Sequence, residues 1–113
     1  MGKLQKTGDN MQAIISESDF NVDSGLYAVK FWATWCAPCK RMNPLLEKME
    51  KEFPGVKILS VDIDQIPSIA QKYKVRSLPT IILMRNGNEE NRINGLVLTA
   101  AMRKAFSDFT AVG

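Results

Sequence analysis

Two cysteines lie where an apolar stretch gives way to a helical pattern, and this junction leaves little choice of fold. Residues 26–33 are nearly continuous in apolar and aromatic side chains, which is typical of a central strand covered on both faces. From Cys36 onward, apolar residues recur on one face of a helix: Met42, Leu45, Leu46, Met49 and Phe53. The chain therefore places a Cys-x-x-Cys pair, Cys36 and Cys39, between a buried strand and a helix, which makes the pair a candidate redox centre.

The rest of the chain alternates between strand and helix patterns. Strands are predicted over residues 11–16, 26–33, 56–63, 80–84 and 89–93, and helices after Ser18, from Cys36, over 65–73 and around 102–109. Asn86-Gly87 favours a tight hairpin, and Pro44 should kink its helix without ending it. The predicted order is β-α-β-α-β-α-β-β-α, an α/β fold with a central mixed five-stranded sheet flanked by four helices. We expect one domain over residues 1–113, with residues 1–10 as a candidate flexible N-terminal segment.

The composition narrows the possible functions. The 113 residues carry a net charge of +3, two cysteines and no histidine. Basic residues are scattered among acids, which favours solvated faces over the continuous basic stripe of a nucleic-acid site. With no histidine and only two cysteines, we do not expect a four-ligand zinc site within one chain. Two cysteines are also too few for a small secreted protein held together by disulfides. No apolar run approaches the ~20 residues that span a bilayer, and no signal-type segment follows the N-terminus. We therefore expect a cytoplasmic protein without membrane or nucleic-acid partners.

Several further motifs occur in the order in which one known family has them. Trp35-Cys36-Ala37-Pro38-Cys39-Lys40 is followed much later by Leu78-Pro79-Thr80. Other landmarks stand in register with these two: Phe31-Trp32-Ala33, Pro44, Asp62-Ile63-Asp64-Gln65 with Pro67, Asn86-Gly87 and Gly95. In these motifs and in the order of its elements, the chain resembles the thioredoxin family over about residues 11–110. The cysteine pair alone would be weak evidence, and the additional landmarks make the resemblance specific.

The resemblance implies a thioredoxin fold and a protein-disulfide reductase that works by dithiol–disulfide exchange, without a metal or an organic cofactor. Cys36 would be the attacking thiol, because the start of a helix stabilises its thiolate, and Cys39 would be the resolving thiol. A substrate-facing surface is implied for Trp35, Ala37, Pro38, Leu78, Pro79, Gly95 and Leu96. Most X-Pro bonds are trans, whereas the resemblance implies a cis bond before Pro79. The implied partners of this monomer are disulfide-containing protein substrates and a thioredoxin reductase or an equivalent electron donor.

Two positions near the dithiol depart from the family pattern. Lys30 stands where thioredoxins place a buried aspartate that accepts the proton of the resolving cysteine, and Ser60 stands where they place a lysine. In one interpretation, Lys30 extends its ammonium group to solvent and has no catalytic role. In the other, Lys30 is a catalytic residue that points at the buried side of the dithiol. A cationic Lys30 would then stabilise the thiolate, and a neutral one could take the proton of Cys39. A third departure is Ala37, which replaces the usual glycine and adds one methyl group beside the attacking sulfur.

Other functions remain open from the sequence. A thioredoxin-fold binding module or accessory subunit would use the apolar patch around Trp35 and Pro79 and would not need the cysteines; the missing aspartate keeps this alternative open. Two chains could also bind zinc or a cluster between their dithiols. The purely structural interpretation is that Cys36 and Cys39 are buried, reduced and inert. The expected function is disulfide reduction.

Overall fold

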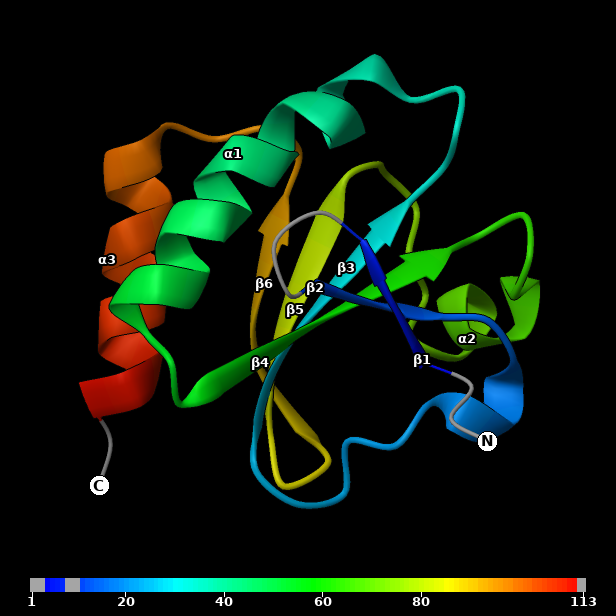
Figure 1. Ribbon diagram of the computed structural model, residues 1–113, viewed down its shortest axis with the longest axis horizontal. Coiled ribbons are helices and arrows are strands. Elements are labelled where there is room, and N and C mark those ends of the chain that lie inside the picture. Colours follow the sequence, from blue (N-terminus) through cyan, green and yellow to red (C-terminus); the bar gives the residue numbers. More distant parts are fainter. Residues whose placement is uncertain (1–3, 8–10, 112–113) are drawn as a thin grey trace.

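The computed structural model describes residues 4–7, as backbone, and residues 11–111. The elements in chain order are β1 (Leu4–Thr7), β2 (Met11–Ile14), the 3-10 turn η1 (Glu17–Asp19), β3 (Leu26–Trp32), α1 (Ala37–Glu52), β4 (Val56–Asp62), α2 (Pro67–Lys72), β5 (Thr80–Arg85), β6 (Asn88–Asn94) and α3 (Thr99–Ala111). Figure 1 shows α1 and α3 side by side, with α2 set apart from both.

The strands form a mixed sheet in the order β1-β2-β4-β3-β5-β6. β2 and β3 run parallel to β4, whereas β5 runs antiparallel to β3 and β6 antiparallel to β5. Parallel neighbours need a crossover connection, and α1 provides the one between β3 and β4. The predicted thioredoxin fold is therefore confirmed. Because β3 and β4 are parallel, their carboxyl ends meet at one edge of the sheet, which is where ligand sites form in such folds.

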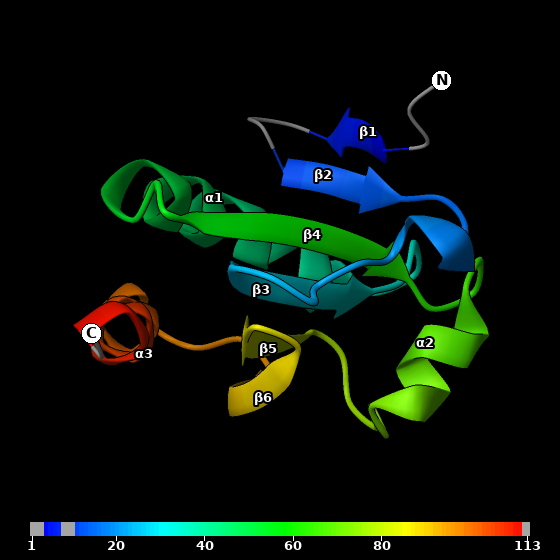
Figure 2. The same ribbon diagram turned by 90° about the horizontal axis from the view of Figure 1, so that it is seen from below.

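Both faces of β3 are covered, as its apolar sequence predicts. Ala28 packs in a cluster with residues of α1 and α3 such as Met42 and Phe106, whereas Val29 packs in a second cluster with Ile69 of α2. Successive side chains of a strand point to opposite faces, so Lys30 lies on the same face as Ala28, beneath α1. Figure 2 shows α2 well away from α1 and α3 when the molecule is turned by 90°.

Helix α1 has the apolar face that the spacing predicts. Met42, Leu46 and Met49 are fully buried, and Pro44 lies inside the helix, which continues past it to Glu52. Pro54 and Gly55 follow the end of the helix, where no further helical turn forms. The helix thus spans the sheet face with its first turn at the cysteine pair.

Two details differ from the prediction. The described residues hold three α-helices, because the helix expected after Ser18 is only the 3-10 turn Glu17–Asp19. Three residues are too few to offset the cost of nucleating an α-helix, and the Ser16 hydroxyl donates to the Asp19 carboxylate within the turn instead. The sheet also gains a sixth strand, because Leu4–Thr7 pairs with β2. The remaining residues of the segment 1–10, namely 1–3 and 8–10, lie outside the described residues.

Candidate active site

The two cysteines form a disulfide at the start of α1, with 5.4 Å between their Cα atoms. Cys36 is the N-cap residue of the helix, and its Sγ accepts a hydrogen bond from the backbone N–H of Cys39 at 3.2 Å. Pro38 lies in the first turn, where its missing N–H would have no partner within the helix. Cys36 is 5% exposed and Cys39 is completely buried. The two sulfurs are therefore not equivalent, because only Cys36 retains access to solvent.

A hollow of about 550 Å³ opens beside Cys36. It is lined by Trp35, Cys36, Ala37, Pro38, Ile63, Val75, Arg76 and Leu78. Four of the residues that the resemblance assigns to a substrate surface, Trp35, Ala37, Pro38 and Leu78, thus lie together around Cys36. The lining is mainly apolar, with Arg76 as its one cation.

Trp35 stands over this hollow as a largely exposed ring. Its side chain is 69% exposed, and its indole N–H donates to the carboxylate of Asp64 at 2.9 Å. Asp64 lies two residues after the end of β4, at the same sheet edge as Cys36. The carboxylate therefore holds the ring in place without covering its face. Trp32, by contrast, packs against the buried cluster of Ala33, Cys36 and Cys39.

The loop before β5 contributes Leu78 to the hollow. The peptide bond between Leu78 and Pro79 is cis, as the resemblance implies. The Pro79 carbonyl accepts a hydrogen bond from the N–H of Gly95 at 2.7 Å, which brings Gly95 to this loop. Leu96 does not line the hollow at Cys36. It is 42% exposed and lines another hollow with Leu98 and part of α1.

Lys30 is buried beneath α1 and does not extend to solvent. Its side chain is 3% exposed, and its Nζ donates to Oδ1 of Asn43 at 2.5 Å. Nζ also lies 5.6 Å from the ring centroid of Trp32, which packs against the cysteine cluster. Ser60 is the cross-strand neighbour of Lys30 and is buried as well.

Burial lowers the pKa of the Lys30 ammonium group from 10.5 to about 8, because the charged form loses solvation. A group with this pKa is mostly protonated at neutral pH and begins to lose its proton slightly above it. The arrangement therefore places a cation, held by the neutral amide of Asn43, on the face of the sheet beneath α1.

The prediction from the sequence did not include several residues of this site. Ile63, Val75 and Arg76 line the hollow, Asp64 holds Trp35, and Asn43 binds Lys30. Asn43 offered a signal, because it lies one helical turn after Cys39 and so on the same side of α1. The position of Ile63 after a strand parallel to β3 offered another. Val75 and Arg76 lie in a loop whose path no local pattern specifies.

A cysteine pair that closes into a disulfide at a solvent-facing helix start can exchange that disulfide with other thiols. The fold and this pair define a protein-disulfide oxidoreductase. Comparison with known proteins agrees, since the family model described as thioredoxin matches residues 4–108. The chain belongs to the thioredoxin family.

Relatives and solved structures show the same likeness. Thioredoxin of Chlamydia trachomatis is 44% identical over 88 residues, which cover 76% of this chain and 86% of the relative. Thioredoxin of Staphylococcus aureus is 42% identical over 84 residues, or 72% and 81% of the two chains. The oxidised crystal structure of mitochondrial thioredoxin 3 from Saccharomyces cerevisiae superposes with a TM-score of 0.78 at 30% identity, over 87% of this chain and 94% of that one. Thioredoxin of Fasciola hepatica gives 0.78 at 32% identity, over 88% and 99%.

These findings favour dithiol–disulfide reduction over a binding role that does not need the cysteines. In the part of the chain that the structure describes, His, Cys, Asp and Glu side chains form no group of three or more that could hold a metal ion. Among residues 4–7 and 11–111, none of the helices has the length and apolar character needed to cross a membrane.

Proposed function

We propose that Cys36 attacks and Cys39 resolves in the reduction of protein disulfides. The Cys36 thiolate attacks one sulfur of the substrate disulfide, so that a Cys36–substrate bond forms while the other substrate sulfur leaves and takes up a proton. Cys39 then loses its proton and attacks Cys36, which releases the second substrate sulfur as a thiol. Two electrons pass to the substrate, and the protein is left with its Cys36–Cys39 disulfide.

The observation that carries these roles is the unequal setting of the two sulfurs. Cys36 lines the hollow and accepts an N–H bond at the start of α1, whereas Cys39 is completely buried. Backbone N–H groups and the positive end of the helix dipole stabilise a thiolate at that position. A protein substrate can reach only the sulfur that lines the hollow.

The proposed docking surface for the substrate combines the hollow with the cis-proline loop. The hollow is lined by Trp35, Ala37, Pro38 and Leu78. The hydrogen bond from the Gly95 N–H to the Pro79 carbonyl holds the residue after β6 against the cis-proline loop. An extended substrate segment would lie along the backbone of Leu78 and add to it in the manner of a strand. Leu96, exposed beyond Gly95, would extend the apolar contact away from the reacting sulfur.

For Lys30 we propose an effect on the redox potential of the pair. A pKa of about 8 leaves the side chain mainly protonated at neutral pH, so electrostatic stabilisation of the thiolate outweighs proton acceptance by the neutral form. A cation that stabilises the reduced form makes the couple more oxidising. Lys30→Met should therefore lower the reduction potential, measured against a glutathione redox buffer, and Lys30→Asp should lower it further. Unchanged potential and turnover in both variants would leave Lys30 with a structural role only.

The oxidised protein needs a separate source of electrons to act again. We propose a thioredoxin reductase or an equivalent donor that supplies two electrons per cycle, so that the protein carries electrons in the redox homeostasis of the cytoplasm. We further propose that the 113 residues act as one domain and as a monomer.

The proposal is tested by following insulin reduction with dithiothreitol as the electron donor. The protein should accelerate the precipitation of reduced insulin, and Cys36→Ser should return the rate to that of dithiothreitol alone. Trp32→Phe, beside the pair but outside the hollow, serves as a control for changes in packing. A Cys36→Ser variant as active as the unchanged protein would contradict the proposal.

A further inference from the structure

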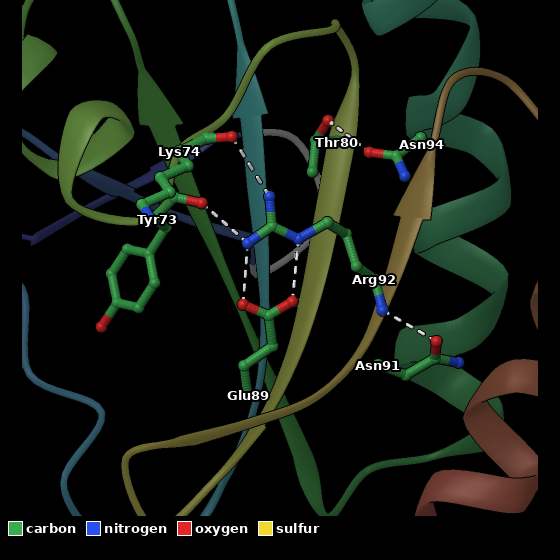
Figure 3. A network of polar contacts seen from close by, with 7 residues as sticks. All are labelled: Tyr73, Lys74, Thr80, Glu89, Asn91, Arg92 and Asn94. Atoms are coloured by element: carbon green, nitrogen blue, oxygen red, sulfur yellow. Dashed lines mark hydrogen bonds and ion pairs between the residues drawn. The ribbon is translucent and has the colours of Figure 1, made fainter.

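Arg92 on β6 makes an unusually complete set of contacts for a residue far from the cysteines in sequence (Figure 3). Its Nε and Nη2 donate to the two carboxylate oxygens of Glu89 at 2.8 and 2.7 Å. The same Nη2 also donates to the backbone carbonyl of Tyr73 at 2.7 Å, and Nη1 donates to that of Lys74 at 3.5 Å. Arg92 thus joins β6 to the segment that follows α2.

The hairpin is built so that Glu89 can orient Arg92. Leu83 pairs with Asn91 and Met84 with Glu89, so the register skips one residue of β6 at a β-bulge. The bulge brings Glu89 and Arg92, three residues apart, to the same face of the sheet. That face is the one that α2 covers. A bidentate carboxylate fixes the plane of the guanidinium group and leaves its outer N–H groups free for other acceptors.

The end of α2 supplies those acceptors. Lys74 adopts a positive φ of 55°, and the Val75 N–H returns to the Ala70 carbonyl at 2.9 Å. This closing turn leaves the carbonyl groups of Tyr73 and Lys74 pointing out of the helix end. A cation at the C-terminal end of a helix is also favoured by the dipole. Arg92 therefore fixes the point at which α2 gives way to the next loop.

That loop forms part of the proposed docking surface. Val75, Arg76 and Leu78 line the hollow beside Cys36. The far end of the loop is tied to the same strand, because the Thr80 hydroxyl donates to the Ser77 carbonyl at 2.7 Å and lies 3.3 Å from Oδ1 of Asn94. Figure 3 shows both attachments, Arg92 at one end of the loop and Asn94 at the other.

We propose that Arg92 is a positioning residue for protein substrates, which fixes segment 73–78 so that this segment presents a preformed surface beside Cys36. The inference rests on the proposed docking surface. The ion pair between Arg92 and Glu89 alone would contribute little to holding the loop, because such pairs near the surface are weak. The hydrogen bonds from Arg92 to the carbonyl groups of Tyr73 and Lys74 are what fix the segment. Substrates that touch only the sulfurs should not depend on Arg92, whereas substrates that lie along the loop should.

The test compares Arg92→Gln with Arg103→Gln. Arg103 offers a matched control, because it makes the same bidentate contact with Glu52 at 2.6 and 2.8 Å but links α3 to α1 and touches none of the loop. Each protein is reduced with dithiothreitol, freed of it, and mixed with either insulin or hydroxyethyl disulfide. Tryptophan fluorescence follows the oxidation of the cysteine pair, so no recycling enzyme is needed.

We expect Arg92→Gln to lower the second-order rate constant with insulin about tenfold, since the lost bonds involve a charged donor. The rate constant with hydroxyethyl disulfide should stay within about twofold by the same reasoning, and Arg103→Gln should change neither. Arg92→Lys, which keeps the charge but lacks the planar guanidinium group that binds Glu89 through two nitrogens, should recover part of the rate with insulin. Hydrogen exchange at the Val75 amide should be faster in Arg92→Gln and unchanged in Arg103→Gln.

If Arg92→Gln lowered the rate constant equally with both substrates, or did not lower it with insulin, the proposed role of Arg92 would be overturned. If the unchanged protein fails to reduce insulin, the proposed function fails instead. The exchange rate at Val75 then still decides whether Arg92 fixes the loop, and an unchanged rate in Arg92→Gln would refute that.

Discussion

Replacing Lys30 by methionine should stabilise the protein at neutral pH, and the gain should shrink as the pH rises. Methionine is unbranched and only one heavy atom shorter than lysine, and it carries no charge to desolvate. Burial lowers the pKa of Lys30 from 10.5 to about 8. At 1.36 kcal/mol per pKa unit, this difference makes the protonated side chain cost the folded state about 3 kcal/mol.

The net effect is smaller, because the variant also loses the hydrogen bond to Asn43. A bond from a charged donor contributes roughly 1.5–3 kcal/mol, but Asn43 is only half-buried and can bind water in its place. We therefore expect Lys30→Met to raise the free energy of unfolding by about 1–2 kcal/mol at pH 7.

The pH dependence follows from which state releases the proton first. Below pH 8, Lys30 is protonated in both the folded and the unfolded protein, so the full cost applies. Between pH 8 and 10.5 the folded protein has released the proton and the unfolded chain still binds it, so the stability of the unchanged protein rises relative to the variant. Above pH 10.5 both states are neutral and the cost has disappeared.

Unfolding by guanidinium chloride, followed by tryptophan fluorescence on the oxidised protein at pH 7, 8.5 and 10, measures this difference. Lys57→Met is the matched control, since Lys57 is an exposed lysine on the neighbouring strand β4, and it should show no such gain. A difference between Lys30→Met and the unchanged protein that stays constant from pH 7 to 10 would refute the reasoning.

Three further predictions concern the core and the docking surface. Leu46→Ala removes a fully buried side chain of α1 and should lower the free energy of unfolding by roughly 2–5 kcal/mol in denaturant titrations; a loss below 1 kcal/mol would show that the core is not packed there. Trp35→Ala should slow the reaction with insulin yet change the free energy of unfolding by less than about 0.5 kcal/mol, because the ring is mostly exposed; an equal rate would remove Trp35 from the docking surface. Ala37→Gly should speed the reaction with insulin and leave that with hydroxyethyl disulfide unchanged, because the methyl group limits approach to Cys36 only for a bulky substrate. Slower reaction with insulin would contradict that interpretation.

Local patterns accounted for most of the fold. Continuous apolar residues over 26–33 and the spacing of Met42, Leu46 and Met49 report directly on burial, and both elements form where the patterns place them. The pairing of Leu4–Thr7 with β2 was not predictable in the same way. Four residues are too few for an alternating pattern to indicate a strand, and this strand is stabilised by its pairing with β2.

In the candidate site, too, features marked by consecutive residues were predicted and contacts between distant segments were not. The cysteine pair was found because it carries a signal in consecutive residues, whereas the cis bond before Pro79 was expected only from the family resemblance. The lysine in place of the usual aspartate was noticed, but its partner Asn43 was not, since that contact depends on how α1 lies across β3. Arg92 carries no motif at all. Its role becomes visible only once the bulge in β6 and the end of α2 are placed beside each other.

Trapping the intermediate separates the roles of Cys36 and Cys39. Reduced Cys39→Ser, mixed with insulin and examined by intact mass spectrometry, should carry an insulin chain bound through Cys36, because no second thiol remains to release it. Dithiothreitol should remove the adduct, and Cys36→Ser should form none, since Cys39 is completely buried. An adduct on Cys36→Ser and none on Cys39→Ser would reverse the assignment of the attacking thiol, and no adduct on either would contradict disulfide exchange through this pair.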